Sequence, residues 1–197
     1  MNKKLKKAVI EYGVIGAIII GLFVSGLHAE VFGFIQRGIL ATGLMNPDIE
    51  EKAELTLSSP AKIGILDFEL VNSKGESVNL EKFRGKVIFL NFWATWCPPC
   101  IAEMPGIENL YQQVKGEHVE FVMISFDREF EKAKDFRKSK GYDFEIYKAT
   151  GRIPGAFSSN SLPTTYVIDT KGNLAFTHLG MGNFDTKDFK KFLLDLQ

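Results

Sequence analysis

The sequence predicts an α/β protein in which a central mixed sheet is flanked by helices. Two nearly unbroken apolar runs, at 87–93 and 119–125, are typical of strands that are covered on both faces. Apolar residues at helical spacing lie between these runs, so we expect a strand–helix–strand unit with parallel pairing. Hairpins are predicted at 65–80 and 165–177, where apolar stretches flank turn residues. The first hairpin is expected as an N-terminal extension of the parallel unit.

Apolar stripes predict the remaining helices of the domain. A helix is expected over 129–140, with Phe130, Ala133 and Phe136 facing inward. The last helix is expected to begin with Asp185 as its cap. Its apolar stripe consists of Phe189, Phe192, Leu193 and Leu196. The expected order is therefore hairpin, βαβ unit, helix, hairpin and helix.

The composition is that of a globular protein with an even charge balance. Hydrophobic residues make up 45% of the 197-residue chain and charged residues 24%, which indicates a buried core. Lys plus Arg equals Asp plus Glu at 24 each, so we expect no nucleic acid as a partner. Cys97 and Cys100 are the two cysteines. This number excludes a disulfide framework and an all-cysteine zinc site within one chain, and we expect no metal or cofactor.

Residues 1–29 are predicted to form a membrane anchor. The stretch 12–29 holds 18 residues without a formal charge, and as a helix it spans roughly 27 Å, close to the ~30 Å hydrocarbon core of a bilayer. The lysines that precede it favour a cytoplasmic N-terminus. They are Lys3, Lys4, Lys6 and Lys7.

We therefore expect a single-pass protein of the cell inner (cytoplasmic) membrane. Its bilayer contact is expected through residues 9–29, and the chain after Glu30 is expected in the extracytoplasmic, periplasmic space. A cleaved signal peptide and a buried soluble helix are the alternatives for the apolar run.

Residues 30–62 are predicted to connect the anchor to the domain at 63–197. Val31, Phe32 and Ile39 fall on one face at helical spacing together with Ile35, which predicts a short amphipathic helix. This helix is expected either at the membrane surface or packed on the domain. The rest of the stretch, up to 62, has the composition of a linker.

The chemistry is predicted at Cys97 and Cys100, which lie between an apolar strand and the start of a helix. Unpaired N–H groups at a helix start favour a thiolate over a thiol. We therefore expect Cys97 to attack a partner disulfide and Cys100, one turn inside, to resolve the mixed disulfide. Pro98 is expected at the first helical position. Half of a zinc site and an inert buried pair are the alternative interpretations.

Residues 92–100, FWATWCPPC, resemble the active-site segment of thioredoxin-fold proteins. The longer stretch 83–105 is similar to the TlpA/ResA-like branch, whose members are membrane-anchored extracytoplasmic thiol–disulfide oxidoreductases of bacteria. The resemblance implies a thioredoxin-like fold over about 63–197. It further implies that Pro163 is a cis-proline whose loop faces the cysteines, and that Glu103 is a buried acid. Asn91 stands where cytoplasmic thioredoxins carry a buried aspartate, and here the chain agrees with the branch.

Physical arguments from the residues themselves also apply to Glu103, Trp96 and Pro163. Glu103 follows Cys100 by one helical turn, so it can approach the thiol, and burial would raise its pKa and allow proton exchange with Cys100. A solvated helix glutamate is the alternative. Trp96 is expected as exposed apolar surface for a partner, with core packing as the alternative. Pro163 suits a tight turn, and an ordinary trans loop proline is the alternative.

The expected reaction is dithiol–disulfide exchange with exported proteins that carry disulfides or thiols. Extended substrate backbone is expected between the active-site helix and the 162–163 loop, bound by Trp96, Pro98, Leu162 and Pro163. We expect a reductase, with apocytochrome c among its candidate clients, and the resemblance implies a membrane-integral thiol reductase as its electron donor. The alternatives are a disulfide-forming oxidase and, from another class, a non-enzymatic metal-binding module of the same fold.

Overall fold

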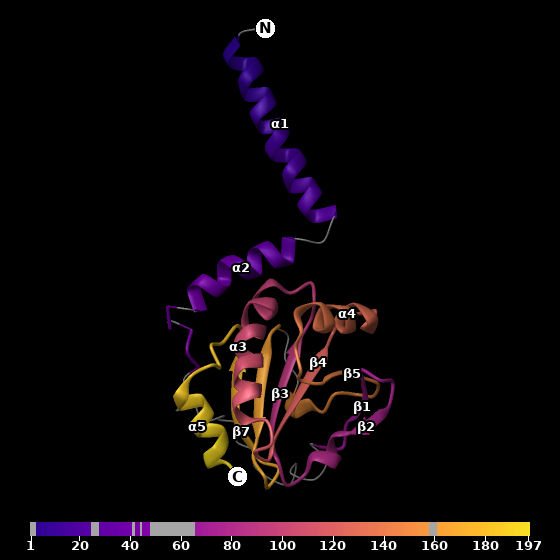
Figure 1. Ribbon diagram of the computed structural model, residues 1–197. Coiled ribbons are helices and arrows are strands. Elements are labelled where there is room, and N and C mark those ends of the chain that lie inside the picture. Colours follow the sequence, from indigo (N-terminus) through magenta and orange to yellow (C-terminus); the bar gives the residue numbers. More distant parts are fainter. Residues whose placement is uncertain (1–2, 25–27, 41, 44, 48–65, 158–160) are drawn as a thin grey trace.

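The computed structural model describes residues 3–24, 28–40, 42–43, 45–47, 66–157 and 161–197. Within these residues one sheet has the strand order β2-β1-β5-β4-β3-β6-β7 (Figure 1). Its strands are β1 (Glu69–Asn72), β2 (Ser77–Asn79), β3 (Val87–Trp93), β4 (Val119–Ser125), β5 (Ile146–Ala149), β6 (Thr164–Ile168) and β7 (Leu174–Leu179). The α-helices are α1 (Lys3–Val24), α2 (His28–Leu40), α3 (Pro98–Val114), α4 (Phe130–Lys140) and α5 (Lys187–Asp195).

The central strand β3 is buried along its whole length, as its apolar run predicts. It pairs parallel with β4 and antiparallel with β6, which confirms the mixed sheet. Because side chains alternate along a strand, β3 contributes to two cores. Phe89 and Trp93 pack with residues of α3 and α5, whereas Ile88, Leu90 and Phe92 pack with residues of the N-terminal hairpin. The strand is therefore fixed on both faces and holds the start of α3 at its carboxyl end.

The strand β5 is an element that the sequence analysis missed. It pairs parallel with β4 and antiparallel with β1, so it joins the N-terminal hairpin to the rest of the sheet. Its four residues, IYKA, are too few and too mixed in polarity to show a strand period. The hairpins β1–β2 and β6–β7 and the unit β3–α3–β4 are as predicted.

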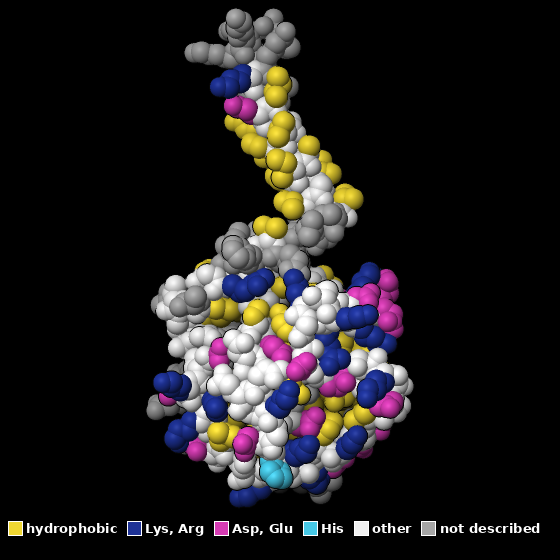
Figure 2. Space-filling model, viewed as in Figure 1, with side chains coloured by type: hydrophobic (Ala, Val, Ile, Leu, Met, Phe, Trp, Pro, Cys, Tyr) yellow, Lys and Arg dark blue, Asp and Glu magenta, His cyan; other side chains and the backbone are white. Residues whose placement is uncertain are grey.

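The helix α1 extends away from the domain, and its apolar side chains are exposed (Figure 1, Figure 2). Ile10, Tyr12 and Ile20 each have more than half of their surface open. Lysines and Glu11 occupy the first turns. In the described part of the chain, no helix combines the length and the apolar content that crossing a membrane requires, so the predicted transmembrane helix is not confirmed.

The helix α2 packs on α3, which is the second of its two predicted placements. Of its predicted apolar face, Val31 and Ile39 are exposed, and the side chains of Phe32 and Ile35 lie outside the described residues. The contact runs through Gly33, whose backbone meets α3, and through the buried Leu40. A glycine contact adds no apolar side chain to the pattern, so the hydrophobic spacing does not mark the contact at Gly33.

The C-terminal helix begins one residue later than predicted. Thr186 is the cap, and its hydroxyl accepts a hydrogen bond from the Phe189 N–H at 3.1 Å. Asp185 instead accepts hydrogen bonds from the side chains of Asn109 and Gln113 on α3, both at 2.9 Å. Asp185 therefore ties the approach to α5 onto α3. The linker predicted up to residue 62 lies, from residue 48 onward, outside the described residues, and so do residues 25–27 of the predicted anchor.

Candidate active site

The two cysteines lie where β3 passes into α3. Cys97 caps the helix, and its Sγ accepts a hydrogen bond from the Cys100 N–H at 3.3 Å. Pro98 is the first helical residue, as predicted, and its missing N–H is one that the helix start leaves unpaired in any case. The positive end of the 17-residue helix thus points at the Cys97 sulfur, where it stabilises a thiolate.

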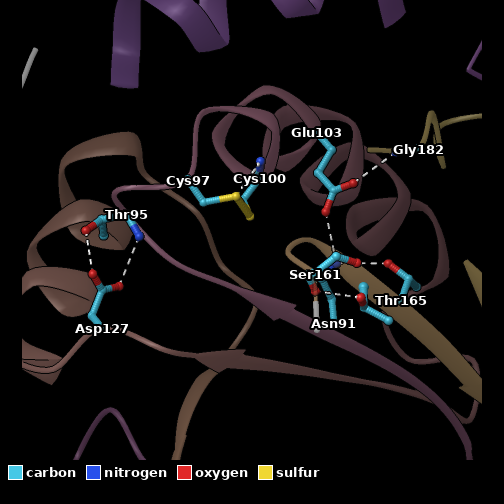
Figure 3. The surroundings of a disulfide bond; sticks show 10 residues. Asn91, Thr95, Cys97, Cys100, Glu103, Asp127, Ser161, Thr165 and Gly182 are labelled. Carbon is cyan, nitrogen blue, oxygen red and sulfur yellow. Dashed lines mark hydrogen bonds between the residues drawn. A yellow bond between two sulfur atoms is a disulfide. The ribbon is translucent and has the colours of Figure 1, made fainter. Parts of the chain in front are cut away.

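Cys97 and Cys100 form a disulfide (Figure 3). Cys97 retains 4% of its surface and Cys100 retains 0%. The more exposed cysteine is the one that an incoming thiolate or disulfide can reach first. The order of reaction predicted from the sequence, attack by Cys97 and resolution by Cys100, fits this difference in burial.

Glu103 is buried one helical turn after Cys100, with 1% of its surface exposed. The predicted burial is therefore confirmed, and the alternative of a solvated helix glutamate is wrong. Its carboxylate accepts hydrogen bonds from Asn91 Nδ2 at 2.9 Å and from the Gly182 N–H at 3.1 Å (Figure 3). Burial raises the pKa of Glu103 to about 8, although both hydrogen bonds act in the opposite direction.

Asn91 connects this carboxylate to the neighbouring strand. The amide nitrogen that donates to Glu103 also donates to Thr165 Oγ1 on β6 at 2.9 Å. Sequence reasoning noted Asn91 only as the replacement for an aspartate and missed both Thr165 and Gly182. No local pattern marks them, because Gly182 lies 79 residues from Glu103 and Thr165 lies 74 residues from Asn91.

The loop before β6 carries the predicted cis-proline. The Leu162–Pro163 peptide bond is cis, so the alternative of a trans proline is wrong. Pro163 is buried, and its carbonyl oxygen accepts a hydrogen bond from the Gly180 N–H at 2.9 Å. Leu162 is half-buried and packs against the core cluster that contains both cysteines. The loop therefore reaches the active-site region from the β6 side.

Trp96 lies beside Cys97 with 57% of its surface exposed, so the alternative of core packing is wrong. Together with Phe126, which is 45% exposed, it borders a cavity of about 390 Å³. The loop that carries Trp96 is held by the buried Asp127, whose carboxylate accepts hydrogen bonds from the Thr95 N–H and hydroxyl at 3.0 and 2.7 Å (Figure 3). Phe126 and Asp127 are not apparent as site residues from the sequence, because their place beside the cysteines depends on the parallel pairing of β3 and β4.

Metal binding finds no support in the described part of the chain. No three His, Cys, Asp or Glu side chains gather there closely enough to hold a metal ion. The chemistry that the arrangement offers is thiol–disulfide exchange, with a buried carboxyl close by that can carry a proton.

Comparisons with known proteins agree with this geometry. The AhpC/TSA family model matches residues 64–177. The thiol-disulfide oxidoreductase ResA of Bacillus subtilis (strain 168) is 35% identical over 149 residues, which cover 72% of this chain and 81% of the relative. ResA of Geobacillus kaustophilus (strain HTA426) is 34% identical over 125 residues, 63% of this chain and 70% of the relative. A thiol:disulfide interchange protein of the thioredoxin family from Chlorobium tepidum TLS matches with a TM-score of 0.57 at 28% identity, over 64% of this chain and 92% of that one.

A disulfide that closes across the first turn of a helix, directly after the central strand of a mixed sheet, is the arrangement of thioredoxin-fold thiol–disulfide oxidoreductases, and this chain is one of them. It belongs to the AhpC/TSA family and, within that family, to the branch of the ResA-like oxidoreductases.

Proposed function

We propose that this chain reduces disulfide bonds of exported proteins while it is held at the outer face of the cytoplasmic membrane. The observation that supports it most is the pair Cys97 and Cys100 at the start of α3, followed one turn later by the buried acid Glu103. The pKa of this carboxyl, about 8, is close to the pKa of an ordinary thiol, ~8.5. A proton can therefore pass between the two groups with little driving force in either direction.

The proposed reaction has two exchange steps. In the first, the Cys97 thiolate attacks one sulfur of the client disulfide, and the other client sulfur leaves as a thiolate that takes a proton from water. In the second, Cys100 gives its proton to the ionised Glu103 and attacks the Cys97 sulfur. The Cys97–Cys100 disulfide forms, and the second client sulfur leaves as a thiolate. Two electrons pass from the cysteine pair to the client.

The resting reduced state has to be restored by a donor of two electrons. We propose a membrane-integral thiol reductase, which would open the Cys97–Cys100 disulfide by the same exchange in reverse. Glu103 would then return its proton to Cys100. The helix dipole at Cys97 assists this step as well, because it stabilises the sulfur that leaves.

The direction of electron flow is proposed from the residues between the cysteines. Pro98 and Pro99 have no N–H, so the Cys100 N–H is the backbone donor that reaches the Cys97 sulfur within α3. A thiolate with fewer donors is less stabilised, and a less stabilised reduced form gives up its electrons more readily. This favours a reductase over the disulfide-forming oxidase.

The client is proposed to lie as extended backbone between α3 and the Leu162–Pro163 loop, with Trp96 and Pro98 at its side. The exposure of Trp96 and the position of Leu162 next to the cysteine-containing core support this placement. Apocytochrome c remains a candidate client. A two-cysteine peptide with the haem-attachment spacing C-x-x-C-H is a direct probe of it.

Attachment to the membrane is proposed from residues 1–29. The lysines that begin the helix and the exposed apolar side chains after them support it, because such a surface is stabilised by contact with lipid. A reporter fused after Gln197 tests the orientation, and a fusion that works only in the cytoplasm contradicts it. Recovery of a processed chain that begins near Glu30 would favour a cleaved signal peptide.

The reduction potential of the Cys97–Cys100 pair tests the proposed direction. We expect a value closer to that of thioredoxin, about −270 mV, than to that of the oxidant DsbA, about −120 mV. A value near the oxidant contradicts the proposal and favours the oxidase. In the same assay, Cys97→Ser should abolish reduction of a client disulfide, whereas Cys100→Ser should accumulate the mixed disulfide. Trapping by the Cys97→Ser variant instead would reverse the assigned roles.

A further inference from the structure

The segment that connects α1 to the domain touches the polypeptide around Glu103. We call α2 together with Met45 and Asn46 the N-terminal clamp. At its first contact, the backbone of Gly33 lies against the start of α3: a Cβ placed there would be 3.2 Å from Ile101 Cγ2 and 3.3 Å from the Pro98 carbonyl oxygen. Both partners belong to the helical turn that carries the cysteines. The clamp is thus seated on the active-site helix itself.

Two further contacts hold the chain on either side of Gly182. Before it, Met181 forms a small buried cluster with Leu40 of α2 and Ala102 of α3. After it, the backbone N–H of Asn183 donates to the Met45 carbonyl oxygen and its side-chain amide donates to Asn46 Oδ1, both at 2.9 Å. The position of Gly182 is therefore set from both neighbours by residues of the clamp.

Gly182 is one of the two donors to the buried carboxylate. Its N–H donates to Glu103 Oε2 at 3.1 Å, and this bond lowers the pKa of Glu103 against the larger effect of burial. Gly182 has no side chain through which it could be held, and a Cβ there would meet the Phe184 ring at 2.7 Å. The geometry of this donor consequently depends on the clamp contacts of Met181 and Asn183.

A cavity of about 270 Å³ lies between the clamp and α3, and Glu103 is among the residues that line it. Its walls include Arg37 and Leu40 from α2, Glu103 from α3, and Gly182 and Asp185 from the loop before α5. The charged and titratable groups near Glu103 are thus Arg37 and Asp185, with His178 of β7 against the Met181 carbonyl oxygen at 3.3 Å. Movement of α2 would change both the Gly182 donor and the access of water to Glu103.

We propose that the N-terminal clamp is a positioning element for Glu103: by holding the Gly182 N–H on the carboxylate, it sets how readily this group takes and returns the proton of Cys100. The chain between α1 and the domain then does more than tether, because any partner or surface that shifts α2 also shifts the rate of exchange. The inference rests on the proposed role of Glu103 as the proton carrier.

Two glycines of α2 provide a matched pair of variants for the full-length chain. Gly33→Leu forces α2 away from Ile101 and Pro98, whereas Gly38→Leu adds the same side chain where a Cβ meets nothing within 4 Å. Asn46→Ala is a milder third variant, since Asn46 is exposed and the change removes its side-chain bond to Asn183. The readout is the pH dependence of disulfide reduction, measured for each variant alone and combined with Glu103→Gln.

Loss of the Gly182 bond leaves the ionised carboxylate less stabilised, so the midpoint of the pH profile should rise. We expect a shift of roughly 1 pH unit for Gly33→Leu, a smaller rise for Asn46→Ala and none for Gly38→Leu. None of them should move the profile when Glu103 is already Gln.

A Gly33→Leu profile that coincides with that of Gly38→Leu, with Asn46→Ala also unchanged, overturns the inference. A shift that persists with Glu103→Gln overturns it too, since the clamp would then act elsewhere. If Glu103→Gln alone leaves the wild-type profile unchanged, the proposed role of Glu103 fails first and the inference falls with it.

Discussion

The side-chain amide of Asn91 donates a hydrogen bond of 2.9 Å to the carboxylate of Glu103, across the junction between β3 and α3. Both groups are fully buried, at 0% and 1% exposure. In the described part of the chain the amide oxygen of Asn91 has no hydrogen-bond partner, so the residue acts here as a donor. A neutral donor next to a buried carboxyl permits ionisation near neutral pH. An aspartate in the place of Asn91 would oppose it through charge repulsion.

Asn91→Ala should raise the pKa of Glu103 above about 8, because the amide bond is one of the two contacts that lower it. The midpoint of the pH dependence of disulfide reduction should move upward by roughly 1 unit, since a hydrogen bond to a charged group is worth about that much. Thr165→Val is the control, because it removes the other acceptor of Asn91 and leaves the bond to Glu103 in place. An unchanged midpoint in Asn91→Ala contradicts the prediction.

The stability of the oxidised protein should fall as the pH rises from about 4.5 to about 8. The folded chain holds the Glu103 proton more tightly than the unfolded chain, so its advantage is complete below the unfolded pKa and is lost as the pH passes the folded one. The loss is on the order of a few kcal/mol, because one pKa unit corresponds to about 1.4 kcal/mol. Urea unfolding at several pH values measures it.

Glu103→Gln supplies the reference for this measurement, because it keeps the shape and removes the titration. The free energy of unfolding of Glu103→Gln should lack the stabilisation by the Glu103 proton that the wild type loses between pH 4.5 and 8. Above pH 8 it should exceed the free energy of unfolding of the wild type. Parallel curves for the two proteins would show that the Glu103 proton is bound equally in the folded and unfolded chains.

Asp127→Ala should destabilise the loop that leads to Cys97. Its buried carboxylate accepts from the N–H and hydroxyl of the half-buried Thr95, and from the hydroxyl of the buried Ser125 at 2.9 Å, so its removal leaves these donors without their acceptor. We expect a loss of ~1–3 kcal/mol in the free energy of unfolding and slower client reduction. Asp127→Asn, which keeps an acceptor, should lose less. Equal losses in the two variants would argue against the hydrogen bonds as the cause.

Trp96→Ala should separate client recognition from chemistry. Because Trp96 is 57% exposed, its removal should change the free energy of unfolding by less than ~0.5 kcal/mol. Reduction of a protein or peptide disulfide should slow several-fold, whereas reaction with a small-molecule disulfide should keep its rate. Trp96→Phe should be intermediate. A uniform loss toward both substrates would assign Trp96 to the chemistry at Cys97 instead.

The structural features that depend on residues close together in the sequence were predicted correctly. The apolar runs of β3 and β4 and the turns of both hairpins are local signals, and the structure has each of them. The position of Cys97 at the start of a helix is equally local, because a strand precedes it and Pro98 follows. The burial of Glu103 was implied by the resemblance to the TlpA/ResA-like branch, and its spacing from Cys100 placed it one turn from the thiol.

Contacts between distant parts of the chain could not be predicted from the sequence. The Gly182 donor, the anchoring of Thr95 by Asp127 and the strand β5 all arise only when the sheet has formed. The contact of α2 with α3 could not be predicted for a related reason. Close backbone approach at Gly33 leaves no trace in a pattern of apolar side chains.

The most direct test of the central claim, thiol–disulfide exchange in which Glu103 carries the proton of Cys100, is the pH dependence of client disulfide reduction in the wild type and in Glu103→Gln. The wild-type rate should show an inflection near pH 8, where Glu103 titrates. The variant should be slower and should lack that inflection, while Cys97 is still alkylated before Cys100. Superimposable profiles for the two proteins would contradict the claim, and the proton of Cys100 would then have to pass through water or another group.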